Sequence, residues 1–122
     1  MSGKVLVVDD SGLARRRIRV ILEAAGYDVI EAEDGLSALE RYFVSKPDLV
    51  VLDLVMKGMY GLDVLTKLRE MDPTARVIVV SADVQTSSQE MVEHAGAAGF
   101  LTKPIDTEQV LTMVRSTLES VR

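Results

Sequence analysis

Four of the five short apolar runs in this 122-residue chain end at or next to a charged or hydroxyl side chain. Asp9 and Asp10 follow the first run, Asp53 follows the third, Ser81 follows the fourth, and Lys103 lies just beyond the fifth. In an open parallel α/β sheet, ligands bind beyond the carboxyl ends of the strands. We therefore expect these side chains to meet at one edge of a sheet.

Three carboxylates at one place would repel one another and resist ionisation unless a cation neutralised them. With oxygen ligands only, and no histidine or cysteine nearby, Mg²⁺ fits this set best. A carboxylate left free to attack phosphorus would form an aspartyl phosphate, while the metal, a lysine and a hydroxyl balance the charge of the phosphoryl oxygens. Asp53 is the candidate because it stands alone at the end of the middle run.

The elements that must position these groups alternate along the chain. Short valine-rich runs are separated by longer stretches of helical period, an alternation typical of βαβ units with a parallel sheet. Several runs are continuously apolar, as expected of strands that are covered on both faces. The predicted strands are Lys4–Val8, Asp28–Ala32, Leu49–Leu52, Arg76–Val80 and Gly99–Leu101.

The first two predicted helices are defined by capping residues and apolar stripes. The first begins near Ser11 or Gly12 and ends at Gly26, a residue suited to the position after a helix. Asp34 caps the second helix. The buried face of this second helix is predicted to contain three residues at helical spacing, namely Leu36, Leu39 and Phe43.

The three remaining helices differ in how firmly they should pack. One is predicted near Gly61–Met71. The next is predicted to start with Ser87 and Glu90 as a capping box, and its apolar stripe is thin, so it should be the least firmly anchored. The last helix has Asp106 and Gln109 in capping positions. We expect it to reach the end of the chain, with no output domain after it.

Length and composition favour one soluble globular domain over residues 1–122. Apolar residues make up 48% and charged residues 27% of the chain, a balance that supports a core. The net charge of -5 disfavours nucleic acid as a direct partner. The apolar run before Asp9 is too short for a signal peptide or a membrane span, so the cytoplasm is the expected location.

Taken in order, these residues resemble a CheY-like response regulator receiver domain over nearly the whole chain. Each matching segment is weak alone, but all five in order are specific: residues 5–11, residues 49–56, Gly58 with Gly61, residues 80–82 and residues 99–104. The resemblance implies a flavodoxin-like (βα)5 fold, in which a doubly wound sheet of five parallel strands carries helices on both faces.

The resemblance also implies a role for each residue at the sheet edge. Asp53 would be the phosphoacceptor, Lys103 would pair with the phosphoryl group, and Ser81 would move to donate a hydrogen bond to it. The implied ligands of Mg²⁺ are Asp9, Asp10, Asp53 and the backbone carbonyl of Val55.

Residues around this centre would control access, switching and lifetime. Ala82 would stay small so that the phosphate can be reached, and Phe100 would be an aromatic switch that turns inward. The Lys103–Pro104 peptide would be cis. Val55, two residues after Asp53, cannot orient water with its side chain, whereas Asp83, two after Ser81, could. We hypothesise that Val55 slows loss of the phosphoryl group.

The implied partners are a histidine kinase or phosphotransfer protein as donor and a downstream output protein. The output protein would bind a face formed by the helix after Ser87, the Gly99–Leu101 strand and the last helix. The protein would be a switch that catalyses only its own phosphorylation and hydrolysis, as a monomer or a phosphorylation-dependent dimer. The arginines of the first helix are expected to form a solvated face, with docking of an acidic partner as the alternative: Arg15, Arg16, Arg17 and Arg19.

Other functions fit a similar sheet less well. A Mg²⁺-dependent phosphohydrolase with an aspartyl-phosphate intermediate would need an acid where Val55 stands. A carrier of FMN would need a phosphate-cradling loop where Asp9 and Asp10 would repel the phosphate. A phosphohistidine carrier would have to use His94, the sole histidine. We expect His94 to be an exposed residue without this role.

Overall fold

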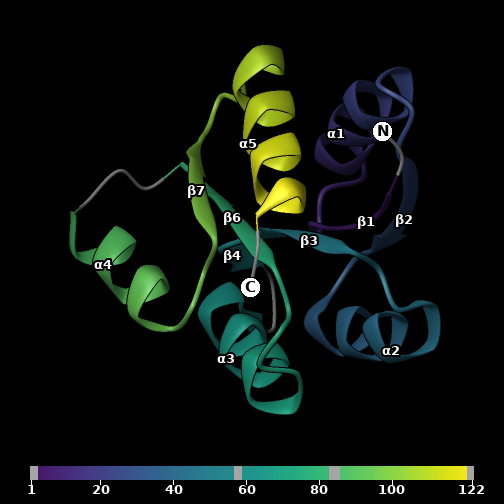
Figure 1. The fold of residues 1–122 in the computed structure, drawn as a ribbon. Coiled ribbons are helices and arrows are strands. Elements are labelled where there is room, and N and C mark those ends of the chain that lie inside the picture. The colour runs from purple at the N-terminus through teal and green to yellow at the C-terminus, as the bar shows by residue number, and fades with distance from the viewer. Residues whose placement is uncertain (1–2, 57–58, 83–85, 121–122) are drawn as a thin grey trace.

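The computed structural model describes residues 3–56, 59–82 and 86–120 and shows a doubly wound α/β fold (Figure 1). In these ranges, five parallel strands form one sheet in the order β2-β1-β3-β6-β7. The strands are β1 (Lys4–Val8), β2 (Asp28–Ala32), β3 (Leu49–Asp53), β6 (Val77–Ser81) and β7 (Gly99–Thr102). The helices are α1 (Gly12–Ala24), α2 (Gly35–Ser45), α3 (Gly61–Met71), α4 (Thr86–His94) and α5 (Thr107–Glu119). The predicted flavodoxin-like fold is confirmed.

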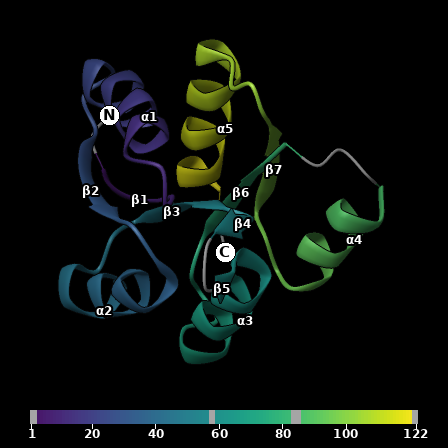
Figure 2. The ribbon, with the colours of Figure 1, turned by 180° about the vertical axis from the view of Figure 1, so that it is seen from behind.

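The helices lie in two layers on opposite faces of the sheet. Figures 1 and 2 show α1 and α5 on one face, and α2, α3 and α4 on the other. Successive strand residues serve different layers: Val5 and Val7 belong to the apolar cluster that contains Ile18 of α1, whereas Leu6 and Val8 belong to the cluster that contains Leu65 of α3. This alternation between two cores explains the continuous apolar runs in the sequence.

Three predicted helix boundaries are confirmed by their capping contacts. The Asp34 carboxylate accepts a hydrogen bond from the Ser37 backbone N–H at 2.7 Å. The Asp106 carboxylate accepts one from the Gln109 backbone N–H at 3.1 Å. Gly26 follows α1 with a positive φ of 94°, a conformation that glycine adopts without strain.

The predicted buried face of α2 is wrong at two of its three residues, Leu36 and Phe43. The side chains of Leu36 and Phe43 are 73% and 41% exposed, and Leu39 is only partly buried. The buried residues of α2 are Gly35, Ala38 and Tyr42. Both sets have the spacing i, i+3, i+7, so periodicity could not separate them. Tyr42 faces inward and its hydroxyl donates a hydrogen bond to Asp72 at 2.7 Å, which holds α2 against the turn after α3.

The start of α4 also differs from its prediction, whereas its weak anchoring is confirmed. The helix begins at Thr86, one residue before the predicted cap Ser87. Residues 86–88 are all hydroxyl residues, so the sequence pattern does not select one of them as the start of the helix. Val92 is the fully buried apolar residue in the described part of α4, while Met91 is 49% exposed.

A short antiparallel hairpin follows β3 and was not predicted. It consists of β4 (Val55–Met56) and β5 (Met59–Tyr60), with Val55 paired to Tyr60. Two-residue strands are too short to give a periodic signal in the sequence. In the described part of the chain, no helix is both long and apolar enough to cross a membrane.

Candidate functional site

The strand order brings the predicted site residues together at the carboxyl edge of the sheet. The strand order switches between β1 and β3, so the connections that leave these neighbouring strands run to opposite faces of the sheet. The carboxylate groups of Asp9, Asp10 and Asp53 each offer an oxygen atom within 4.8 Å of the others. The Lys103 ammonium nitrogen lies 3.4 Å from Asp9 Oδ2 and 3.4 Å from Asp53 Oδ1.

Asp9 is buried and fixed by several contacts. Its backbone N–H donates to the Ala32 carbonyl oxygen at 3.2 Å, which extends the pairing of β1 with β2 by one residue. Its Oδ1 accepts a hydrogen bond from the Ser11 backbone N–H at 2.9 Å, and its Oδ2 faces Lys103. Asp10, the next residue, is exposed at the mouth of the site.

Asp53 is positioned by the close approach of α3 to the end of β3. The Gly61 backbone N–H donates to the Leu54 carbonyl oxygen at 2.7 Å. A Cβ atom added to Gly61 would lie 2.7 Å from Leu54 Cα and would also meet the carbonyl oxygen of Asp53. Only glycine therefore fits where the helix meets the strand that carries Asp53.

The electrostatics of the site leave an excess of negative charge. Burial and the charge of Asp9 raise the pKa of Asp53, against the opposing effects of Lys103 and the Val55 backbone N–H. Burial works to lower the pKa of Lys103, but the carboxylates of Asp53 and Asp9 outweigh it and raise this pKa overall. One ammonium group thus contacts two of three clustered carboxyl groups, an arrangement that suits a hard divalent cation with oxygen ligands.

The residues predicted for access and switching lie at the end of β6, on β7 and directly after these strands. Ser81 is buried at the end of β6, and Ala82 after it is exposed. Phe100 of β7 is partly buried and packs against the apolar cluster beneath α2, α3 and α4. The Lys103–Pro104 peptide is cis, as predicted. Asp83 lies outside the described residues.

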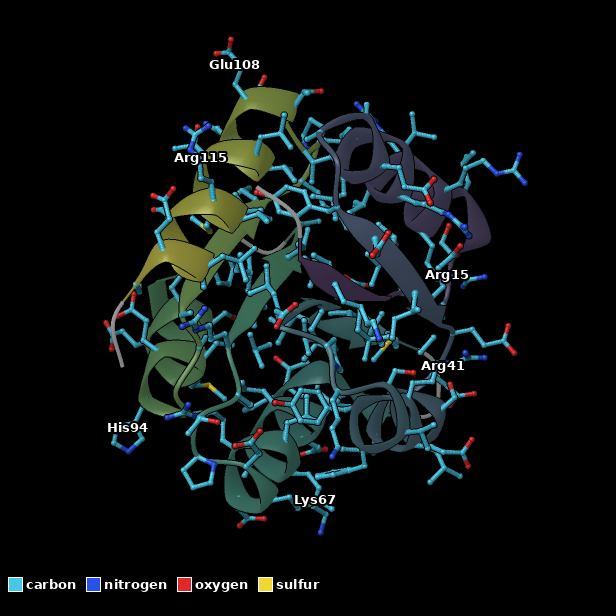
Figure 3. All side chains as sticks on the ribbon, turned by 45° about the vertical axis from the view of Figure 1, so that its right-hand side comes forward. Arg15, Arg41, Lys67, His94, Glu108 and Arg115 are labelled. Carbon is cyan, nitrogen blue, oxygen red and sulfur yellow. The ribbon has the colours of Figure 1, made fainter. Side chains whose placement is uncertain are left out.

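Two of the arginines assigned to a solvated face in fact make ion pairs. Arg15 and Arg19 both bind Glu31 of β2, while Arg16 and Arg17 are exposed. His94 is exposed as predicted, and Figure 3 shows it pointing outward at the end of α4.

Comparison with known proteins gives the same assignment along almost the whole chain. Residues 5–115 match the response regulator receiver domain family. The chemotaxis protein CheY of Bacillus subtilis is 38% identical over 119 residues, which cover 97% of this chain and 99% of that protein.

Solved structures of receiver domains share the fold. A chain of the CheX–CheY–BeF3–Mg²⁺ complex from Borrelia burgdorferi is 33% identical, with a TM-score of 0.91 over 96% of this chain and 90% of that chain. The receiver domain of the response regulator NarL from Mycobacterium tuberculosis is 31% identical, with a TM-score of 0.92 over 98% of each chain. The chain therefore belongs to the CheY-like receiver domains of two-component response regulators.

Proposed function

We propose that residues 1–122 form a single-domain switch that accepts a phosphoryl group on Asp53 in a Mg²⁺-dependent reaction. The donor is a phosphohistidine on a histidine kinase or a phosphotransfer protein. The observation that carries this proposal is the convergence of Asp9, Asp10, Asp53 and Lys103 at one edge of the sheet. The family to which the chain belongs supports the same role.

The proposed ligands of Mg²⁺ are the carboxylates of Asp9, Asp10 and Asp53, together with the backbone carbonyl of Val55. The three carboxylates fit this ion because they supply oxygen donors and excess negative charge within a space of 4.8 Å. The CheY complex from Borrelia burgdorferi is described as containing Mg²⁺. When bound, Mg²⁺ neutralises charge on the carboxylates and on the phosphoryl oxygens.

In the proposed transfer, a carboxylate oxygen of Asp53 attacks the phosphorus atom of the donor. An oxygen–phosphorus bond forms, the nitrogen–phosphorus bond of the phosphohistidine breaks, and the electron pair stays on the departing imidazole. Lys103 pairs with the phosphoryl oxygens, and its raised pKa keeps it positively charged at neutral pH. The catalysis is limited to the protein's own phosphorylation and hydrolysis.

A groove beside Lys103 is the proposed docking site for the donor protein. It has a volume of about 510 Å³ between α1 and the residues after β7, and its apolar lining includes Leu13, Pro104 and Ile105. The exposed arginines Arg16 and Arg17 border it and suit an acidic partner. A donor bound here would lie next to the Lys103 and Asp53 pair.

The proposed output runs through Ser81 and Phe100 to the face formed by α4, β7 and α5. Ser81 donates a hydrogen bond to the phosphoryl group, Ala82 leaves the approach open, and Phe100 changes its packing beneath α4. A groove of about 1020 Å³ on this face is lined by residues of β7 and α5, including Phe100, Thr102 and Met113. This groove is the proposed binding site of the output protein.

The test is phosphorylation by a small-molecule donor. Incubation with acetyl phosphate and Mg²⁺ should add the mass of one phosphoryl group, measured by intact mass spectrometry. Asp53→Ala should abolish the gain, whereas Asp63→Ala, which changes an exposed aspartate of α3, should not. No gain in the wild-type protein, or a gain that survives Asp53→Ala, would overturn the proposal.

A further inference from the structure

One arginine of α1, Arg15, binds the backbone of the loop that carries Asp9 and Asp10. The Arg15 Nη1 donates a hydrogen bond to the backbone carbonyl oxygen of Asp9 at 2.7 Å. The Arg15 Nε donates to Glu31 Oε1 on β2 at 2.9 Å. The Arg15 side chain is only 17% exposed, so this guanidinium bridges helix, strand and loop in a partly buried position.

Glu31 is itself fixed, which makes it a firm anchor for Arg15. Its second oxygen, Oε2, accepts a hydrogen bond from Arg19 Nη1 at 2.7 Å. The hydrogen bond from Arg19, with further contributions from Arg15, lowers the pKa of Glu31 despite the opposing effect of burial. Glu31 therefore stays ionised at neutral pH, and its two oxygens bind one arginine each.

The hydrogen bond from Arg15 binds the backbone carbonyl oxygen of Asp9, a group that the contacts to Ala32 and Ser11 do not use. The contact from the Ser11 N–H to Asp9 Oδ1 closes a turn across the Asp9–Asp10 peptide and narrows its range of orientations. Because the peptide is planar, a hydrogen bond to the carbonyl oxygen adds a direct restraint on the plane itself. The orientation of this peptide decides the direction in which the exposed residue Asp10 leaves the strand.

We infer that Arg15 is a positioning residue, which holds the Asp9–Asp10 peptide so that both carboxylates reach the proposed Mg²⁺ site. The inference rests on the proposed function. A role as a positive charge and a role in holding the loop predict opposite effects of removing Arg15 on the affinity for Mg²⁺. If Arg15 acts only as a positive charge near a cation site, its loss should strengthen Mg²⁺ binding. If it holds the loop, its loss should weaken Mg²⁺ binding.

The experiment measures binding of Mg²⁺ alone by isothermal titration calorimetry, without a phosphodonor. Arg15→Met removes both hydrogen bonds and the charge, whereas Arg15→Lys keeps the charge but loses the forked geometry. We expect the Kd for Mg²⁺ to rise about tenfold in both variants, as is typical when a group that orients metal ligands is lost.

Arg41→Met is the matched control for loss of charge. Arg41 is exposed on α2 and lines the same hollow of about 270 Å³ as Arg15 and Glu31. Figure 3 shows the two arginines on the same side of the molecule. Arg41 lies outside the bridge from Arg15 to Asp9, so Arg41→Met should leave the Kd unchanged or slightly lower.

A second readout separates positioning from general damage. In phosphorylation by acetyl phosphate, the Mg²⁺ concentration for half-maximal rate should rise in Arg15→Lys, while the rate at saturating Mg²⁺ stays near that of the wild type. Melting temperatures in a chelator verify that the variants are folded, and Arg15→Lys alone decides the matter if Arg15→Met does not fold.

The outcomes distinguish this inference from the proposed function. Wild-type Mg²⁺ binding with an unchanged or lower Kd in Arg15→Lys and in folded Arg15→Met would overturn the positioning role and leave the proposed function intact. A wild-type protein that binds no Mg²⁺ would overturn both.

Discussion

Asp53 combines features that an isolated aspartate after a strand does not have. It is buried, its pKa is raised by burial and by Asp9, and Lys103 approaches it at 3.4 Å. Val55, two residues further along the chain, is 62% exposed. An apolar side chain at this place cannot align a water molecule for attack on a phosphoryl group.

The lifetime of the phosphoryl group should therefore depend on Val55. We expect Val55→Asn to speed loss of the phosphoryl group by about tenfold, because an amide can orient the attacking water. The measurement is the decay of the phosphorylated mass after removal of acetyl phosphate. Val44→Asn, the same change at an exposed position of α2, is the control. An unchanged decay rate in Val55→Asn would contradict the assigned effect of Val55.

At the scale of residues, the convergence of the charged side chains could be predicted from the sequence. Asp9, Asp10, Asp53 and Lys103 were predicted to converge because acidic or basic groups at the ends of parallel strands meet at one edge. The bridging position of Arg15 was not predicted, because an arginine on an amphipathic helix has the same sequence pattern whether it faces water or a neighbouring carbonyl group.

At the scale of elements, the junction of β3 and α3 leaves no space for a side chain at Gly61. We expect Gly61→Ala to destabilise the protein by about 1–3 kcal/mol, because a Cβ atom there would force the backbone of Leu54 to move. It should also slow phosphorylation, because the same backbone carries Asp53. Urea unfolding and the rate of reaction with acetyl phosphate measure the two effects.

The control for this prediction is Gly12→Ala at the first residue of α1. A Cβ atom on Gly12 meets only the end of the Arg15 side chain, at the ordinary contact distance of 3.6 Å. The stability of Gly12→Ala should equal or slightly exceed that of the wild type. Equal stability of Gly61→Ala and the wild type would show that the junction tolerates a side chain.

The strands and most helix boundaries could be predicted from the sequence, whereas some helix faces could not. Asp34 and Asp106 were correct caps because their side chains satisfy backbone N–H groups locally. The buried face of α2 depends on the turn after α3, which Tyr42 reaches through Asp72. A contact between residues 30 positions apart does not change the helical spacing of apolar residues, so that spacing cannot reveal it.

At the scale of the whole molecule, the layers are not equally well fixed. The helix α3 buries Gly61, Val64, Leu65 and Leu68, whereas Val92 is the fully buried apolar residue among the described side chains of α4. Figures 1 and 2 both show α4 at the outer end of its layer, beside the edge strand β7. A helix with so little buried area is the one most easily displaced.

The backbone amides of α4 should therefore exchange with solvent at least about tenfold faster than those of α3. Hydrogen exchange followed by mass spectrometry measures both helices in one experiment. Addition of Mg²⁺ with beryllofluoride should change the exchange of α4 more than that of α2, which serves as the internal control. Exchange of α4 as slow as that of α3 would contradict the proposal that α4 is the element that reports phosphorylation.

The two-layer core places the side chains of neighbouring strand residues in separate packing environments. Leu6 and Val7 are adjacent in β1, yet they pack into different clusters on opposite faces of the sheet. Substitutions in different clusters that lie more than about 7–10 Å apart and share no packing partners have nearly additive effects on stability, whereas substitutions within one cluster are coupled. One layer can therefore accumulate substitutions without compensation in the other. Divergence of partner-binding faces can proceed while the carboxyl edge of the sheet keeps its geometry.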